Sequence, residues 1–379
     1  SYLINGEFDK AKEFKLIAPS KLVKSSMYDL PDFIVNLKNE KLIDIKNFSS
    51  MKNQLPGFKM IFEQINYLKL VKNNNFNDIV IERNKSNVFN LLIFEGTKIE
   101  NQIHSNMPKT NLSLIENILY LGYLKRNYPK IFDNKIKIFS STFNYDIGTL
   151  KHYFKNEKKI KKIPDHRFIF ANLFSYLSYL LSSQKNIPNS YLKTLNEISH
   201  YLDPTLGNSN YFLAEIYSSE NNFEIALKKL DRIEESSFIF LHSRIKKYKI
   251  LKIIDKNKSN LLLKNIQERY PKNSNVLFLI ANNFREQNKC SKAIKIYDKL
   301  IERSLNKRNY YYLKAICLDK LNKWEDSKEI LINLISEKPN DAYILNYLSY
   351  SMVIRNENLI EAKKLIFKAL KIEKNNGFF

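Results

Sequence analysis

A repeat period of about 34 residues in the C-terminal half constrains the fold of this chain more than any other feature. Small residues recur at a nearly constant interval in the middle of apolar segments, at Ala214, Ala281, Ala315 and Ser349. Lys247 occupies the same position in the second unit and is the one large residue of the series. A second series keeps the same interval, at Ala226, Ser259, Ala293, Ser327 and Ala362. A fixed period of this length indicates a stack of similar supersecondary units, because one such unit cannot bury its own apolar face.

The residue types within one period predict two helices. Apolar residues recur at helical spacing around each small residue, and a small side chain lets two helix backbones approach within about 8–10 Å. Pro204, Pro271 and Pro339 share one phase, each two periods from the next. Proline ends a helix because it has no N–H to donate, so it separates one unit from the next. The pattern therefore predicts an all-α chain of helical hairpins.

These residues resemble the tetratricopeptide repeat family, whose units have two antiparallel helices and about 34 residues. The matching features are the paired small residues, the recurring prolines and large partners such as Tyr217, Phe284 and Tyr297. The resemblance implies a right-handed α-solenoid with five units at residues 207–239, 240–273, 274–307, 308–341 and 342–379. Lys247 departs from the family at a small-residue position. The usual glycine between helices is replaced by Asn221, Asn288 or Asn322, and asparagine tolerates the left-handed conformation.

The last unit resembles a terminal segment found in bacterial, especially proteobacterial, tetratricopeptide proteins. Those relatives continue beyond a stretch like Asn376-Gly377, so we expect the sequence to be a fragment of a longer protein with an uncovered apolar edge beside Ala369 and Ile372. In this expectation the last helix directs Leu359, Leu365 and Ile366 toward the core. Relatives of this kind are often exported, which favours the cell envelope or periplasm over the cytoplasm.

The sequence of residues 1–206 predicts degenerate helical hairpins that continue the solenoid. Helical apolar spacing occurs at residues 58–70, 112–126, 166–181 and 191–202, and Gly6 with Ala11 resembles the turn of one further unit. The stretches at 79–81 and 88–94 are rich in β-branched or apolar residues and would also suit strands. Because their neighbours are helical, we expect helices there.

The net charge of +23 raises the question of a polyanionic partner. Residues 1–200 carry +12 of it and residues 201–379 carry +11, so the excess is spread evenly rather than gathered in one basic patch. The densest cluster is Lys155, Lys158, Lys159, Lys161 and Lys162, which we interpret as a solvated linker, with a polyanion contact as the alternative. No apolar run long enough to span a bilayer is present, so no transmembrane helix is expected.

The sequence offers little chemistry for catalysis or metal binding. Cys290 and Cys317 fall in helical patterns without metal-ligand spacing, which favours buried thiols. The five histidines are scattered at His104, His152, His166, His200 and His242. Asp165-His166 is interpreted as a helix start beside a surface histidine, Glu234-Glu235 as a solvated loop, and Trp324 as a core residue. No nucleophile-elbow or phosphate-loop motif occurs. We therefore predict no enzyme activity, no cofactor and no metal.

The leading hypothesis is a scaffold that captures a peptide or partner protein in a groove lined by the first helix of each unit. The family resemblance maps the groove to Arg244, Tyr248, Asn275, Phe278, Asn282, Arg285, Asn309, Tyr312, Asn346 and Tyr350. Asparagine and arginine can hydrogen-bond an extended backbone, and aromatic rings supply rigid apolar area. The carboxylate clamp of chaperone-binding relatives is not reproduced, because Leu279, Leu313 and Tyr347 stand at its positions.

Three alternatives stay open. The predicted groove residues could form an ordinary solvated face. A basic superhelix could instead bind RNA or an anionic membrane surface, with strong dependence on salt. The chain could also be an accessory module of a larger enzyme whose catalytic domain lies outside this sequence.

Overall fold

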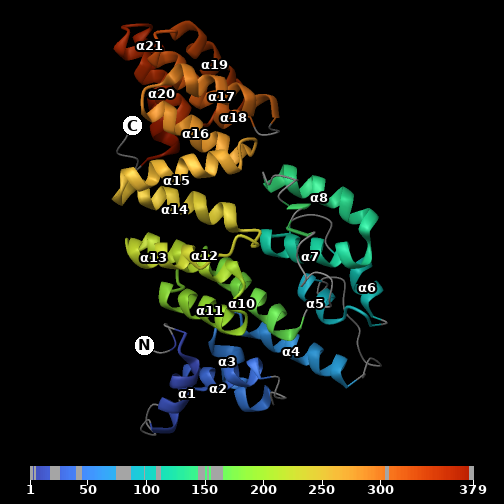
Figure 1. Cartoon of the computed structure of the whole chain (residues 1–379). Coiled ribbons are helices and arrows are strands. Elements are labelled where there is room, and N and C mark those ends of the chain that lie inside the picture. The colour runs from blue at the N-terminus through green and yellow to red at the C-terminus, as the bar shows by residue number, and fades with distance from the viewer. Residues whose placement is uncertain are drawn as a thin grey trace. The chain divides into compact units, whose positions relative to one another are not determined.

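The computed structural model describes residues 3, 6–17, 26–39, 45–73, 87–97, 99–107, 112–143, 150–151, 153–154, 165–303 and 307–374. Within these residues every regular element is helical, which confirms the all-α class (Figure 1). The chain forms two compact units, residues 1–262 and 263–379, and the division falls inside helix α15. The stretch at 79–81 and the lysine cluster at 155–162 lie outside the described residues.

The first unit begins with a non-repetitive part. Its helices are α1 (Phe8–Ile17), α2 (Ser26–Lys38), the 3₁₀ turn η2 (Ile45–Phe48), α3 (Ser49–Gln54), α4 (Phe58–Lys72), α5 (Val88–Ile93), α6 (Glu100–Ser105), α7 (Leu114–Asn127) and α8 (Pro129–Phe143). The expected helix at 88–94 is confirmed by α5, whose first turn is capped by the side chain of Asn87. Asparagine is favoured there because its side-chain oxygen accepts a hydrogen bond from a free helix N–H.

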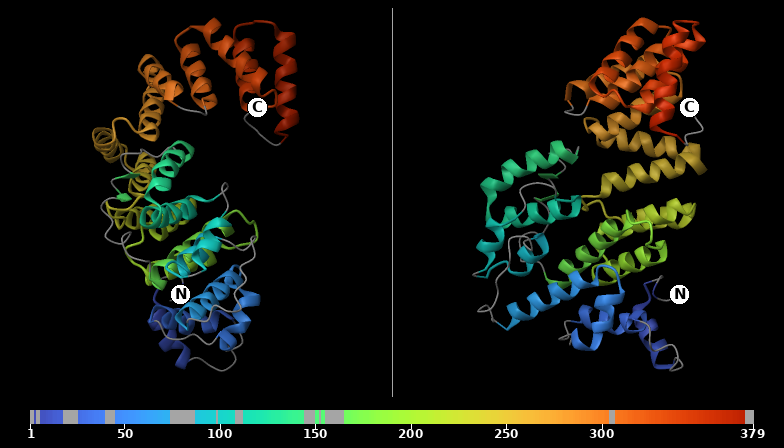
Figure 2. Two further views of the ribbon diagram at one scale, coloured as in Figure 1. Left: turned by 90° about the vertical axis from the view of Figure 1, so that its right-hand side faces the viewer. Right: turned by 180° about the vertical axis from the view of Figure 1, so that it is seen from behind.

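The first unit then continues as stacked antiparallel helices. These are α10 (His166–Ser182), α11 (Asn189–Leu202), α12 (Gly207–Ser219), α13 (Phe223–Asp231), α14 (Phe240–Ile254) and the first half of α15 (Lys256–Arg269). Consecutive helices pack on one another from α10 through α14. Helix α5 packs against α10 and α7, and helices α5 to α8 lie beside the stack rather than in line with it (Figures 1 and 2).

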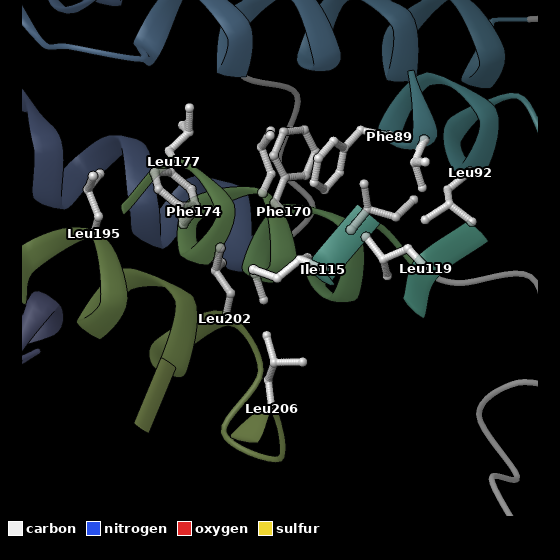
Figure 3. Close-up of a cluster of buried hydrophobic side chains, with 14 of the residues drawn as sticks. Phe89, Leu92, Ile115, Leu119, Phe170, Phe174, Leu177, Leu195, Leu202 and Leu206 are labelled. Atoms are coloured by element: carbon white, nitrogen blue, oxygen red, sulfur yellow. The ribbon is translucent and has the colours of Figure 1, made fainter. Parts of the chain in front are cut away.

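Aromatic and aliphatic side chains explain why α5 and α7 lie beside α10. Phe89 of α5, Ile115 of α7 and Phe170 of α10 lie together in one buried cluster (Figure 3). Elsewhere on α10, the ring of Phe174 lies 6.0 Å from that of Phe58 in α4. Burying a large apolar side chain contributes about 1.5–3 kcal/mol, so a helix that carries several such residues can hold more than one neighbour. Sequence periodicity indicated the helices and did not indicate this lateral packing.

The second unit contains three complete hairpins. They are α16 (Ser274–Glu286) with α17 (Cys290–Arg303), α18 (Arg308–Lys320) with α19 (Trp324–Glu337), and α20 (Ala342–Ile354) with α21 (Leu359–Ile372). Each of these helices packs against the next along the chain (Figure 2). Below, α12, α14, α16, α18 and α20 are called first helices, and α13, α15, α17, α19 and α21 second helices.

The helix starts carry the period seen in the sequence. First helices begin at residues 207, 240, 274, 308 and 342, and second helices at 223, 256, 290, 324 and 359. The small residues Ala281, Ala293, Ala315 and Ala362 are fully buried at the helix crossings. Between the two helices of a hairpin, Asn221, Asn288 and Asn322 have φ of 62°, 57° and 59°. This is the left-handed conformation expected of residues that replace glycine there.

The C-terminal helix differs from the expectation in two respects. Ala369 is 0% exposed, because it packs with Ala342 and Leu345, so it does not belong to an uncovered edge, whereas Ile372 is exposed. Leu359, which was expected to face the core, is exposed at the start of α21. Leu365 and Ile366 do pack against the preceding helices.

Candidate partner-binding surface

The first helices of the second unit carry eight of the ten predicted groove residues. On α16 these are Asn275, Phe278, Asn282 and Arg285, on α18 Asn309 and Tyr312, and on α20 Asn346 and Tyr350. Asn309 and Tyr350 are exposed, and the other six are half-buried. We call these eight residues the first-helix surface.

Aromatic contacts join neighbouring first helices at this surface. The ring of Phe278 on α16 lies 5.5 Å from that of Tyr310 on α18, in an edge-to-face arrangement. The ring of Tyr312 on α18 lies 6.0 Å from that of Tyr347 on α20, with the planes at 87°. Edge-to-face pairs hold rings in defined orientations; of these four rings, Tyr310 is buried and the other three are half-buried.

Arg285 brings a positive charge to this surface. Burial raises the pKa of Tyr297 to about 12. The nearby Arg285 guanidinium opposes this rise. Burial also raises the pKa of Tyr312, Asp341 adds to the rise, and the charge of Arg285 opposes it. Asn282 is turned toward its own hairpin partner, because its Oδ1 accepts a 3.0 Å hydrogen bond from the Tyr297 hydroxyl.

Helix α20 has the most open part of the surface. Its sequence, AYILNYLSYSMVI, contains no charged residue. Tyr343, Asn346, Tyr350 and Val353 follow helical spacing along one face, and Tyr350 is 62% exposed. Exposed tyrosine and valine beside an amide suit an uncharged peptide segment better than a phosphate backbone.

The two predicted residues on α14 do not face outward. Tyr248 is 3% exposed, so its assignment to the groove is wrong. Arg244 reaches back to the preceding helix, where its guanidinium donates to the Leu230 carbonyl and lies 3.4 Å from an Asp231 carboxylate oxygen. The loop before α14, residues 232–239, is longer than the loops between the later hairpins. Family spacing therefore does not determine which face of α14 meets α13.

Polar ties, that is, ion pairs and hydrogen bonds, join neighbouring hairpins of the second unit; those of Asp319 and Arg308 connect residues about one period apart, and that of Lys314 connects residues 16 apart. Asp319 of α18 accepts hydrogen bonds from the hydroxyls of Tyr347 at 2.8 Å and Ser351 at 3.2 Å, and it pairs with Arg355. Arg308 lies 3.2 Å from Asp341, and Lys314 lies 2.7 Å from Asp298. Sequence reasoning missed these ties, although opposite charges about one period apart were a usable signal.

These ties also limit what the surface can bind. Arg308 and Lys314 are engaged by acids within the array, so neither is available to follow a phosphate backbone. Leu279 and Leu313 are half-buried, and Tyr347, the third residue at the clamp positions, donates its hydroxyl to Asp319. The observed side chains at these positions therefore offer no cationic clamp for a terminal carboxylate.

The remaining predicted features have structural roles. Asp165 caps α10 by accepting from the Phe168 N–H at 2.9 Å, as expected. His166 is buried rather than at the surface, and its Nε2 lies 3.0 Å from the Leu37 carbonyl oxygen. Trp324 is half-buried and packs against a buried apolar cluster, as predicted, and its Nε1 donates to Glu357 at 2.6 Å.

The two cysteines are buried, as predicted, and the fold brings them together. Cys290 of α17 and Cys317 of α18 share one apolar cluster. Burial, followed by the neighbouring Cys290 thiol, raises the pKa of Cys317 to about 12. A thiol with such a pKa is a poor nucleophile at neutral pH, so the pair acts as apolar packing.

The described residues show neither a metal site nor a membrane-spanning helix. No group of three or more His, Cys, Asp or Glu side chains in this part of the chain is arranged to hold a metal ion. Among the same residues, no helix combines the length and apolar character needed to cross a bilayer. Glu234 and Glu235 lie exposed between α13 and α14.

Comparison with known proteins identifies the repeat. The tetratricopeptide repeat family matches residues 275–304, which comprise nearly all of the α16–α17 hairpin. The resemblance to this family drawn from the sequence is therefore confirmed at the repeat containing Ala281 and Ala293. No curated protein sequence matches the chain.

Several solved helical-repeat structures are similar to part of the chain. "MamA 41-end from Desulfovibrio magneticus RS-1" is 12% identical, with a TM-score of 0.37, over 45% of this chain and 97% of that one. A "Crystal structure of MamA" is 16% identical, with a TM-score of 0.35, over 44% and 98%. YrrB, described as "a TPR protein with an unusual peptide-binding site", is 12% identical, with a TM-score of 0.35, over 48% and 93%.

Proposed function

We propose that this tetratricopeptide repeat protein is a non-enzymatic scaffold that binds a peptide or partner protein on the first-helix surface of its second unit. The observation that carries the proposal is the uncharged, exposed face of α20, with Tyr350 62% exposed beside Asn346. Apolar side chains in a repeat array are normally covered by the next helix, so exposed aromatic residues on a first helix favour a role in binding.

The rest of the surface supports a peptide rather than a nucleic acid. Asn309, Asn346 and the rings of Phe278 and Tyr312 can contact an extended backbone and its apolar side chains. Binding of RNA depends on lysine and arginine contacts to many phosphates. On α18 the cations Arg308 and Lys314 are already paired with Asp341 and Asp298.

The proposal is tested with peptides selected from a displayed random library against the intact chain. The double change Tyr350→Ala with Asn346→Ala should weaken binding of the selected peptides at least tenfold, because aromatic anchors carry most interface energy. The matched control is Ile332→Ala, which removes an exposed apolar side chain from the second helix α19. Equal binding by the double variant and the intact chain, or loss in the control alone, would contradict the proposal.

A further inference from the structure

The outward face of α21 combines exposed apolar residues with lysines. The helix buries Ala362 and Ala369 completely. On its other side, Ile360 is 74% exposed and Phe367 is 53% exposed. They are two helical turns apart, which places them on one face at roughly 10 Å from each other.

Lysines surround these two residues. Lys363, Lys364 and Lys371 are exposed and fall on the same face of the helix by the helical period. The Lys363 ammonium lies 5.9 Å from the centroid of the Phe367 ring. The Lys364 ammonium lies 3.4 Å from a Glu361 carboxylate oxygen, and both side chains are exposed, so the pair is weak. We call Ile360, Lys363, Lys364, Phe367 and Lys371 the α21 patch.

The other second helices show that this face is particular to α21. Counted from the helix start, the position of Ile360 is occupied by a polar residue in every other second helix: Glu224, Asn257, Ser291 and Glu325. The position of Phe367 is occupied by Asp231, Lys264, Asp298 and Ile332. Ordinary stacking of this array therefore needs no apolar residue at the position of Ile360.

We propose that the α21 patch docks on an anionic lipid bilayer, with α21 lying parallel to the membrane plane. Ile360 and Phe367 would enter the boundary between head groups and acyl chains, and the lysines around them would contact anionic head groups. Charge complementarity selects this occupant. Two α21 patches meeting face to face would oppose lysine to lysine, and an exposed isoleucine gains nothing from a phosphate backbone.

The α21 patch is separate from the first-helix surface, so this inference does not depend on the proposed peptide binding. The evenly spread net charge gave no indication of it. Only the placement of Ile360 and Phe367 on the exposed side of α21, opposite Ala362 and Ala369, distinguishes this lysine-bearing helix from the others.

The experiment is flotation of the full chain with vesicles of phosphatidylcholine alone, or of phosphatidylcholine and phosphatidylserine mixed two to one, at low and physiological salt. We expect binding only to the anionic vesicles, and weaker binding as salt rises. Two variants test the patch: Ile360→Ser with Phe367→Ser, and Lys363→Ser with Lys364→Ser and Lys371→Ser. The first should weaken binding at least tenfold. The second should weaken it about 100-fold, because each lysine near such a surface contributes roughly fivefold.

Matched controls come from the neighbouring second helices. Ile332→Ser removes an exposed apolar residue from α19, and the triple change Lys292→Ser, Lys295→Ser and Lys299→Ser removes exposed lysines from α17. Both controls should bind anionic vesicles within twofold of the intact chain. All changed side chains are exposed, so circular dichroism melts should be unaltered in every variant.

Three results would overturn the inference. Equal loss in the α17 triple variant would mean that net charge alone draws the chain to the vesicles. Undiminished binding after Ile360→Ser with Phe367→Ser would exclude insertion of these side chains. Self-association in sedimentation that this same double change abolishes, without vesicle binding by the intact chain, would assign the patch to a second copy of the protein.

Discussion

Replacing Ala281 with arginine tests whether the small residues stand at close helix crossings. Ala281 is fully buried in α16 and belongs to the apolar cluster with Ala293 and Tyr297. An arginine there must displace packed neighbours, at about 1–3 kcal/mol, and must bury or expel a charge, at about 1–3 kcal/mol more. We expect a loss of about 3–5 kcal/mol in the free energy of unfolding of residues 263–379.

The equivalent position in α14 shows why the loss should be specific. Lys247 occupies it naturally, and its ammonium lies 2.6 Å from an Asp231 carboxylate oxygen of the preceding second helix. In α15 the position of Asp231 is taken by Lys264, so an arginine at residue 281 meets no acid from that position. A long cation is tolerated in the array only where an acid faces it.

Thermal melting followed by circular dichroism measures the effect. For a unit of this size, the expected loss corresponds to a decrease in Tm of roughly 10–25 °C. The control Gln287→Arg adds the same charge at an exposed position just after α16 and should leave the melt unchanged. An unaltered melt for Ala281→Arg would refute the reasoning, because it would mean that residue 281 does not stand at a close crossing.

Three further changes test other parts of the structure. Asn322→Val should cost about 1–2 kcal/mol in a denaturant melt while Asn322→Gly should not, because residue 322 is left-handed at φ 59°; equal melts would contradict this. Burial, reinforced by Lys249, lowers the pKa of His242 to about 4 in the folded state. As pH falls from 6.5 to about 4 the unfolded chain is protonated first, so stability should fall by up to about 3 kcal/mol, and His242→Gln should remove that dependence; an unchanged pH profile in the variant would refute it. Asp319→Ala should cost about 2–4 kcal/mol in urea unfolding, because Arg355 loses its partner; a loss below about 0.5 kcal/mol would show that the tie contributes little.

The helical hairpins could be predicted because their packing requires small residues at helix crossings, and these residues recur at a fixed period in the sequence. Ala281 and Ala293 are small since backbones meet there, and that requirement acts on the residue at a fixed place in every unit. Asn322 is likewise dictated locally, because a left-handed residue must end the first helix of each hairpin. Such signals lie within a few residues of the feature that they determine.

Other features depend on contacts between distant segments and left no local signal. Helix α5 lies beside α10 through contacts such as that between the rings of Phe89 and Tyr176, 5.4 Å apart. These residues are far apart in the sequence, and apolar periodicity does not identify such a partner. His166 is buried because the Leu37 carbonyl meets its ring. Tyr248 carries the residue type and spacing of a groove residue, yet it turns into the core. For the candidate site, sequence could propose positions but could not tell which side chains stay exposed.

Site-specific photo-crosslinking tests the central claim most directly. A benzoylphenylalanine placed at Tyr350 on α20, or at Ile332 on α19 as the control, replaces an exposed apolar side chain in each case. With library-selected peptides, irradiation should produce a covalent adduct from residue 350 and little from residue 332, and unlabelled peptide should compete the adduct away. Adducts at residue 332 with none at residue 350 would contradict binding on the first-helix surface.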